Sequence, residues 1–187
     1  APKMHASAYG AFYKALTEQW LYRTSGKLRQ PRHDRRVSKS AINALVALVK
    51  EERRRPVDAR FVWWNIRVFM EIMSMHDHSL LGSALAEAKV EDTWLALMVH
   101  GEIDINRGWR LYPQHDSAVK PHLRHRLANA GRQAGKHFRQ AWEAHPEIPD
   151  AAMKMVEVAM IGGDDQSPRY WFDHAVKAQM DFIQVYN

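Results

Sequence analysis

Apolar residues recur along most of the chain at intervals of three and four positions, which is the period of an α-helix. Strand-like alternation of apolar and polar residues is nearly absent. The pattern therefore predicts an all-α fold of antiparallel helical hairpins. The expected helices cover about 5–23, 38–55, 57–75, 79–88, 91–109, 117–142 and 149–160, with another from 167 and the start of one more at 181–187.

The segment FVWWNIRVFMEIM, 61–73, is the most apolar part of the chain, and its apolar residues fall on nearly all sides of a helix. Such a helix is typical of a central, buried position. Asn65, Arg67 and Glu71 interrupt the run, which is also shorter than the roughly 18 residues that a membrane span requires. We therefore expect no transmembrane segment.

Proline and serine mark several helix boundaries. A helix reading PDAAMKMVEVAM, 149–160, begins at a proline and ends before two glycines. Ser167 is expected to cap the following helix, with Pro168 in its first turn. In the N-terminal half, Ser38 or Ser40 is the expected cap of the second helix, so the basic stretch that precedes them is expected to be a loop.

One helix of the C-terminal half carries small and aromatic residues at fixed offsets. Ala134, Phe138 and Ala141 lie four and three residues apart, and Pro146 follows five residues later. Small alanines let two antiparallel helices approach closely, the aromatic ring fills the space toward the next pair, and the proline ends the helix. These offsets resemble those of the second helix of a tetratricopeptide repeat.

The same pattern returns 34 residues later, since Phe172 and Ala175 repeat the phase of Phe138 and Ala141. That interval is the tetratricopeptide period. The segment 127–187 thus resembles the tetratricopeptide-repeat (TPR) superfamily. The resemblance implies a right-handed solenoid in the C-terminal half of one all-helical domain, 1–187, with an N-terminal helical part, 1–90, and a TPR-like part, 91–187.

The order of segments is also similar to an uncharacterised bacterial family with a TPR-like C-terminal half, whose members carry a helix that ends in Arg-Gly. Arg107 and Gly108 match that position, although the glycine-rich insert that follows in the family is short here. Pro121 and Val156 depart from the usual TPR pattern. The resemblance implies architecture, not chemistry.

A stacked helical repeat presents a concave surface, which favours a non-enzymatic scaffold that binds a protein or peptide, as part of a larger assembly. Methionine suits such adaptable contacts. Helix phase gives the expected partner-binding residues: Asn106, Arg107, Arg110, Asp150, Met153, Lys154, Glu157 and Met160. We expect no catalytic residue and no cofactor. The oligomeric state stays open.

The first rival hypothesis is a metal-binding or hydrolytic protein that uses His76, Asp77 and His78. Two histidines in alternate positions of an extended segment can reach one cation, and an aspartate can complete the set. The same run is also typical of an exposed junction between helices, which makes these residues weak candidates. Sequence patterns of serine hydrolases, P-loops and dinucleotide-binding folds are absent.

The segment HGEIDINRGWR, 100–110, is a second place where carboxylates could perform acid-base chemistry. Helical spacing instead pairs Glu102 with Asn106 and Asp104 with Arg107, which favours local hydrogen bonds and ion pairs. The chain has seven tryptophans, and most lie in apolar helical patterns that are typical of a core. Trp109, next to a glycine near a helix end, is the one we expect to be exposed.

Composition adds a charge argument. The 187 residues carry a formal charge of +6 and no cysteine, and 46% are apolar, which is enough for a core without disulfides. A basic patch is expected at Arg29, Arg32, Arg35 and Arg36. It suggests an acidic protein partner, and the less favoured alternative is nucleic acid bound through Arg32, Arg35, Arg36 and the arginines at 53–55. Ala1 is compatible with cleavage of an export signal or with removal of methionine, so the sequence leaves the compartment open.

Overall fold

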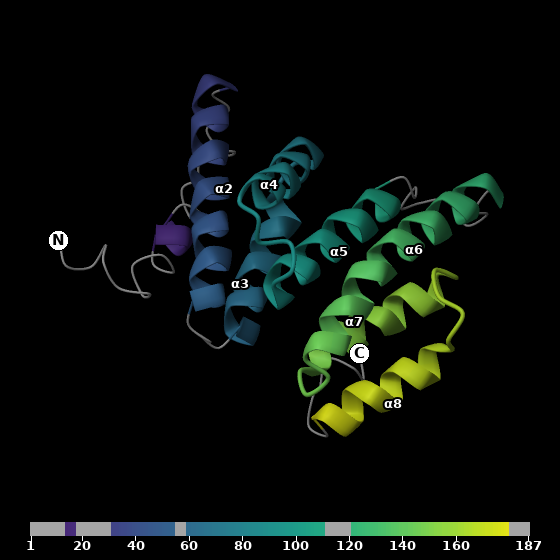
Figure 1. The fold of residues 1–187 in the computed structure, drawn as a ribbon. Coiled ribbons are helices and arrows are strands. Elements are labelled where there is room, and N and C mark those ends of the chain that lie inside the picture. Colours follow the sequence, from purple (N-terminus) through teal and green to yellow (C-terminus); the bar gives the residue numbers. More distant parts are fainter. Residues whose placement is uncertain (1–13, 18–30, 55–58, 111–120, 180–187) are drawn as a thin grey trace. The chain divides into compact units, whose positions relative to one another are not determined.

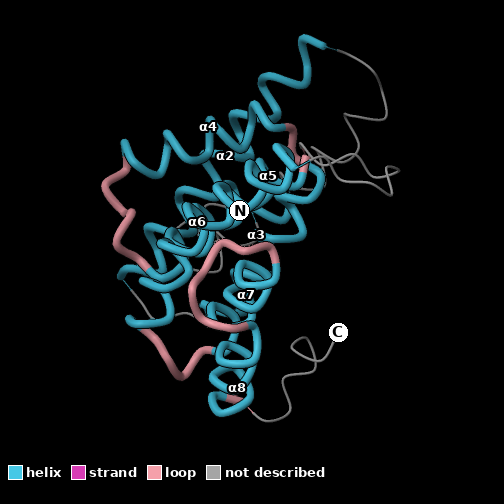
Figure 2. The backbone as a smooth tube through the Cα atoms, turned by 90° about the vertical axis from the view of Figure 1, so that its right-hand side faces the viewer, coloured by secondary structure: helices cyan, strands magenta, loops and turns pink. Residues whose placement is uncertain are grey.

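The computed structural model describes residues 14–17, 31–54, 59–110 and 121–179 (Figure 1). Regular structure in these segments is α-helix, with no strand, so the expected all-α class is confirmed. Figure 2 traces the described backbone as cyan helices joined by short pink connections. No helix in the described part of the chain is long and apolar enough to cross a membrane. Of the helix expected at 5–23, the structure describes only residues 14–17, which are helical, and the helix expected to start at 181–187 lies outside the described residues.

The chain divides into two compact units, Ala1–Ala96 and Leu97–Asn187. The N-terminal unit holds α2 (Pro31–Arg54), α3 (Ala59–Ile72) and α4 (Met75–Glu87). The C-terminal unit holds most of α5 (Trp94–Trp109), with α6 (Pro121–Ala144), α7 (Pro149–Met160) and α8 (Pro168–Ala178). The division falls a few residues after the boundary expected between 90 and 91.

Helix α2 begins earlier than the sequence indicated. It starts at Pro31, whose fixed φ suits a first helical position, so Ser38 and Ser40 lie inside the helix and do not cap it. The expected loop at 32–36 is therefore helical. The expected inward face of α2 is confirmed, because all four of its residues are buried: Ala41, Leu45, Leu48 and Val49.

Helix α3 has one buried face. Its buried residues are Val62, Trp63, Ile66, Phe69 and Met70. On the opposite side Phe61 is 55% exposed and Val68 is 40% exposed, so the expectation of burial all round is wrong. Helix α2 packs against α3 and α4.

In the C-terminal unit, α7 packs against both α6 and α8 (Figure 1). Helix α7 has the bounds that its proline and glycines predicted. The cap of α8 is also confirmed, since the Ser167 hydroxyl accepts a hydrogen bond from the Tyr170 N–H at 3.2 Å, and Pro168 occupies the first turn. Helix α5 begins at Trp94 and not near Glu91, because the Thr93 hydroxyl accepts from the Ala96 N–H at 3.2 Å.

The core of the C-terminal unit is built from the small and aromatic residues of the expected repeat. Ala134, Phe138, Ala141 and Ala175 are all fully buried, as is Trp171. Phe172 is only half-buried, so its burial differs from that of Phe138. The handedness of the helix stack stays a prediction.

Two glycine positions allow the helices of this unit to approach closely. A Cβ atom on Gly101 of α5 would lie 2.7 Å from Cδ1 of Phe138 on α6. One on Gly163, after α7, would lie 2.7 Å from the carbonyl carbon of Gly131 on α6. Since no ordinary side chain fits these spaces, the approach depends on the missing Cβ atoms. It brings α5, α6 and α7 together around the site described next.

Candidate functional site

A groove of about 430 Å³ lies in the C-terminal unit, where α5 ends, α6 begins and α7 ends. We call it the C-terminal groove, and it is lined by Trp109, Arg124, Leu127, Glu157, Met160 and Ile161. Trp109 is 38% exposed and Met160 is 73% exposed. Two large apolar side chains thus face solvent beside an arginine. The exposure expected for Trp109 is confirmed.

A polar network fixes one wall of this groove. The Trp109 indole N–H donates to Oε1 of Glu157 at 2.7 Å. The other oxygen of the same carboxylate, Oε2, lies 3.1 Å from the Lys154 ammonium nitrogen. The network therefore holds the indole of α5 against α7 in one orientation.

Lys154 continues this network into the interior. Its Nζ lies 2.8 Å from Oε2 of Glu102 on α5, and both side chains are about as buried as the core, with 5% and 6% of their surface exposed. Asn106 donates to the second oxygen of Glu102 at 3.4 Å. One ammonium group thus links two carboxylates, one buried and one at the groove.

Two of the expected partner-binding residues are not on the surface. Asp150 is fully buried and Lys154 is 4% exposed, so the prediction that they line an open face is wrong. Lys154 is buried because α5 covers this side of α7, through the Glu102–Lys154 and Trp109–Glu157 contacts. Helix phase placed these residues on one face of α7, but it could not show that the face is covered.

The other expected partner-binding residues fall into two groups. Glu157 and Met160 line the C-terminal groove, and Met153 is partly buried elsewhere on α7. On α5, Asn106 is partly buried, whereas Arg107 and Arg110 are exposed and are not among the groove residues. The local pairs expected on α5 are confirmed, because Asn106 bonds Glu102 and Arg107 lies 3.5 Å from Asp104.

Sequence reasoning missed most of the groove. It did not connect Trp109 with α7, and it did not select Arg124, Leu127 or Ile161. The signal that could have located the groove was Trp109, a large aromatic side chain expected to be exposed at the end of its helix. No local pattern links positions that are 48 residues apart, as Trp109 and Glu157 are.

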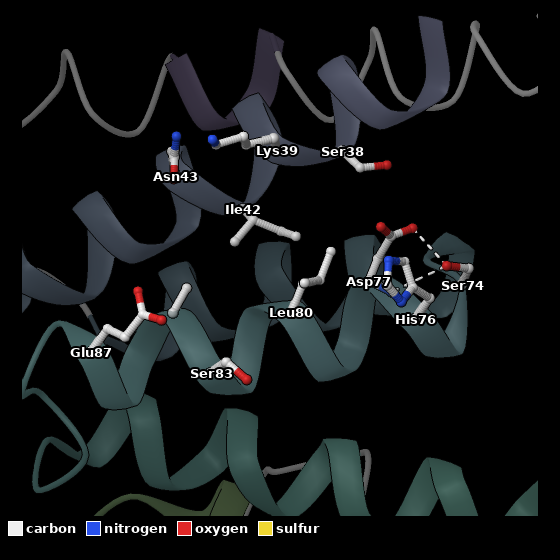
Figure 3. A pocket seen from close by; sticks show the side chains of 11 residues that line it. Ser38, Lys39, Ile42, Asn43, Ser74, His76, Asp77, Leu80, Ser83 and Glu87 are labelled. Atoms are coloured by element: carbon white, nitrogen blue, oxygen red, sulfur yellow. Dashed lines mark hydrogen bonds between the residues drawn. The ribbon is translucent and has the colours of Figure 1, made fainter. Parts of the chain in front are cut away.

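A second hollow lies between α2 and α4 in the N-terminal unit and has a volume of about 560 Å³. We call it the N-terminal cavity (Figure 3). Residues of α2 form one side: Ser38, Lys39, Ile42 and Asn43. Ser74 and residues of α4 form the other: His76, Asp77, Leu80, Ser83, Ala84 and Glu87. It therefore contains two of the three weak metal candidates.

The three metal candidates do not converge. Helix α4 begins at Met75, so His76, Asp77 and His78 occupy its first turn, where successive side chains diverge by about 100°. His78 is fully buried and its Nε2 lies 2.8 Å from the Met70 carbonyl oxygen, while His76 is exposed. The expected extended segment is therefore wrong. In the described residues no group of three or more acidic or histidine side chains could hold a metal ion.

The missed signal was the sequence SMHD, 74–77, in which a serine is followed three residues later by an acidic residue, the spacing of a capping box. The Ser74 hydroxyl accepts from the Asp77 N–H at 3.1 Å and donates to Asp77 Oδ2 at 2.7 Å. These two bonds begin α4 at Met75. Asp77 thus has a structural role at the start of the helix and also a place in the cavity.

The expected basic patch is described only in its backbone. Arg32, Arg35 and Arg36 lie in the first turns of α2, and Arg29 lies outside the described residues. The nucleic-acid hypothesis that rests on these residues stays a prediction.

A histidine pair joins α5 to α6 away from the groove. The rings of His100 and His137 are stacked with centroids 5.4 Å apart, and Nε2 of His137 lies 3.6 Å from Oδ2 of Asp104. Burial lowers the pKa of His137 below the usual value of 6.5; the Asp104 charge opposes this effect, and Lys136 adds to it. The folded state therefore favours neutral His137.

We expect the C-terminal unit to lose stability as the pH falls below about 6.5, because the unfolded chain then binds a proton at His137 more readily than the folded chain does. The stabilisation is complete above that pH. Urea unfolding of the full chain at pH 7.5, 6.5 and 5.5 measures it. His137→Gln should weaken the pH dependence. If the natural protein and His137→Gln lost the same stability between pH 7.5 and 5.5, His137 would not be the cause of the pH dependence.

Comparison of the chain with protein-family models, curated proteins and solved structures gave no match. Function is therefore inferred from the side chains themselves. The C-terminal groove offers exposed apolar surface, a fixed indole and a cation, which suit binding.

Proposed function

We propose that this protein is a non-enzymatic helical binding protein whose C-terminal groove accepts an acidic protein segment with an exposed apolar side chain. The observation that carries the proposal is the exposure of Trp109 and Met160 on one groove of about 430 Å³. Large apolar side chains gathered at a hollow are typical of interaction sites. Tryptophan and arginine are also the residues that most often dominate binding energy.

The rigidity of the groove supports binding to a preformed surface. The hydrogen bond from Trp109 to Glu157 and the ion pair from Lys154 to Glu157 hold the indole before a partner arrives. Less side-chain freedom is then lost on binding. Met160, which is 73% exposed at the end of α7, supplies an adaptable apolar contact in the same groove.

Charge supports an acidic partner. Arg124 lines the groove, is exposed, and forms no ion pair with the residues that the structure describes. The same exposed stretch of α6 also carries His122, His125 and Arg126. The groove carboxylate, Glu157, is already paired with Lys154. A partner carboxylate would therefore meet an available cation and no uncompensated negative charge.

The helix order α5 to α8 supports a TPR-like stack as the frame of this site, and we propose that the pairs wind with a right-handed sense. In such a stack each helix pair buries its apolar face on the next. A role as one component of a larger assembly follows from the same proposal.

Selection from a random peptide library tests the occupant, followed by affinity measurements with synthetic copies of the selected peptides. We expect acidic peptides that contain at least one large apolar residue. Met160→Ala should weaken their binding by about 5-fold or more, and Trp109→Ala by about 30-fold, as for a binding hot spot. Arg124→Glu should abolish the preference for acidic sequences.

Phe61→Ala is the matched control, since Phe61 is 55% exposed but belongs to α3 in the other unit. It should leave the affinity unchanged. Selected peptides that are basic, or that bind Met160→Ala and Trp109→Ala as tightly as the natural chain, would refute the proposed groove. Circular dichroism of each variant separates lost binding from lost folding.

A further inference from the structure

Helix α6 carries most of the excess positive charge of the chain, which has 27 basic and 21 acidic residues. Residues 121–142 contain no aspartate or glutamate. Five of them are arginine or lysine: Arg124, Arg126, Arg132, Lys136 and Arg139. Exposed helices usually gain stability from pairs of opposite charge, such as Arg169 and Asp173 on α8, which lie 2.8 Å apart. Along most of α6 the helix itself has no carboxylate to form such a pair.

The basic residues of α6 form an exposed row. We call this row the outer face of α6, and it consists of His125, Arg126, Asn129, Arg132, Gln133 and Lys136. Spacings of three and four residues place these side chains side by side over a length of about 16 Å. Arg139 is paired with Asp164 and is not part of the row. Of the α6 cations only Arg124 lines the C-terminal groove, so the outer face is a separate surface.

The three cations of the outer face keep their charge available. Within the segments that the structure describes, Arg126, Arg132 and Lys136 form no ion pair. The Arg132 guanidinium donates to the side-chain oxygen of Asn129, and Lys136 Nζ donates to Oε1 of Gln133 at 3.1 Å. Both acceptors are uncharged amides. They orient the two cations without cancelling their charge.

Helix stability does not explain this distribution of charge. Arg132 and Lys136 are like charges four residues apart, a spacing at which they destabilise a helix. The first turn of α6 holds Arg124 and no acidic residue, although the helix dipole favours negative charge there. Residues that oppose the local rules of stability are typical of functional surfaces.

The hydrogen-bonding chemistry of α6 favours a partner that only accepts. Every exposed residue of α6 from His122 to Gln140 is histidine, arginine, lysine, asparagine or glutamine. Each of these side chains offers an N–H donor. A partner with a row of negatively charged oxygen atoms therefore fits this surface. The phosphate groups of a nucleic-acid backbone form such a row.

The lack of apolar side chains on this face decides between polyanions. A tightly bound protein usually meets large apolar anchors, and a helix on a membrane surface buries an apolar face. Single-stranded nucleic acid stacks its bases on aromatic rings. Between His122 and Gln140 of α6 no exposed residue is apolar or aromatic. The face therefore suits a duplex, which presents its phosphates on the outside.

We propose that the outer face of α6 binds the phosphate backbone of a nucleic-acid duplex without reading its sequence. Arg126, Arg132 and Lys136 contact phosphate oxygens, and Asn129 and Gln133 add neutral donors. The length of about 16 Å corresponds to about five nucleotides of one strand along the duplex axis. Duplex DNA and duplex RNA share this chemistry. The inference does not rest on the C-terminal groove, whose lining residues are different.

Fluorescence anisotropy of labelled duplexes mixed with the full chain tests this surface. We expect DNA and RNA duplexes to bind, with affinities for two unrelated sequences of each type that differ by less than about 2-fold. The logarithm of the association constant should fall with the logarithm of the salt concentration with a slope of about −3, because three cations displace counterions. A preference for DNA or for RNA would support the proposal and identify the source of the duplex.

Two variants and a matched control assign the contacts. Lys136→Gln should make the salt slope shallower by about one, and the double variant Arg132→Gln with Lys136→Gln by about two. The double variant should also bind about 10-fold or more weakly at low salt. Glutamine is a good helix former, so both variants should fold, which circular dichroism checks. Lys177→Gln, exposed on α8 in the same unit, should leave the slope and the affinity nearly unchanged.

Absence of binding to both duplexes at low salt would overturn the proposal, as would equal effects of Lys136→Gln and Lys177→Gln. Tighter binding of single strands than of duplexes would overturn it as well. Two competitors test the other polyanions. If polyglutamate displaced the labelled duplex as well as unlabelled duplex does, the partner would be an acidic protein. The same result with phosphatidylserine vesicles would indicate a membrane, and either result would refute the duplex assignment.

Discussion

Replacement of Lys154 by methionine is expected to lower the free energy of unfolding by about 3–5 kcal/mol, because it removes one partner of a buried ion pair. Lys154 Nζ lies 2.8 Å from Glu102 Oε2, and both side chains are almost fully buried. Methionine fills a similar volume. The loss therefore comes from the Glu102 carboxylate, which stays in the interior without its counter-charge.

Urea unfolding of the full chain, followed by circular dichroism, measures this loss. Lys177→Met is the control, because Lys177 is exposed on α8, and we expect it to change stability by less than about 0.5 kcal/mol. The double variant Glu102→Met with Lys154→Met removes both charges and should recover much of the stability. Equal stabilities of Lys154→Met and Lys177→Met would show that the buried pair contributes little.

The same substitution also separates the structural role of Lys154 from the binding role of the groove. Lys154 is the ion-pair partner of Glu157, which in turn orients Trp109. Under conditions where Lys154→Met stays folded, we expect peptide affinity at the groove to fall although Lys154 is not at the surface. Met160→Ala should lower affinity with little change in stability, since its side chain is largely exposed.

What the sequence predicted well rests on local signals. Pro149 and the two glycines after Met160 set the bounds of α7, and Ser167 with Pro168 set the start of α8. Each signal acts through bonds within one turn of the helix that it begins or ends. The boundaries that were missed also had local causes, since Ser74 begins α4 as its N-cap, a signal that sequence reasoning overlooked.

Contacts between distant segments could not be predicted from the sequence. Lys154 and Glu102 are 52 residues apart, and nothing near either residue shows that α5 covers that side of α7. A lysine at helical spacing from other polar residues is usually exposed, which is why the helix phase suggested an open surface. Phe61 shows the opposite error, since this aromatic residue of an apolar helix is 55% exposed.

The second large loss of stability is expected on truncation of Phe138. The repeat in the sequence makes Phe138 equivalent to Phe172, whereas in the structure only Phe138 is fully buried. Phe138→Ala should lower the free energy of unfolding by about 3–5 kcal/mol, as for other fully buried phenylalanines. Its ring is fully buried where Gly101 allows α5 to approach α6. The cavity left behind would lie between these two helices.

Phe172→Ala is the matched comparison, and we expect it to cost at most about 1.5 kcal/mol, because a half-buried ring removes less apolar surface from water. The Phe172 ring also lies 5.3 Å from the Arg169 guanidinium carbon, a contact near the surface that adds little. Urea unfolding of both variants gives the comparison directly.

The difference between the two costs tests how far the repeat extends. If the helix stack continued, a following helix pair would cover the ring at the position of Phe172, as neighbouring helices cover the ring of Phe138. A small cost at Phe172 in the chain alone therefore means that this end of the stack has an uncovered ring. Equal losses of stability in Phe138→Ala and Phe172→Ala would mean that the Phe172 ring is as well covered in solution as the Phe138 ring. That result would favour the equivalence of the two positions suggested by the 34-residue repeat.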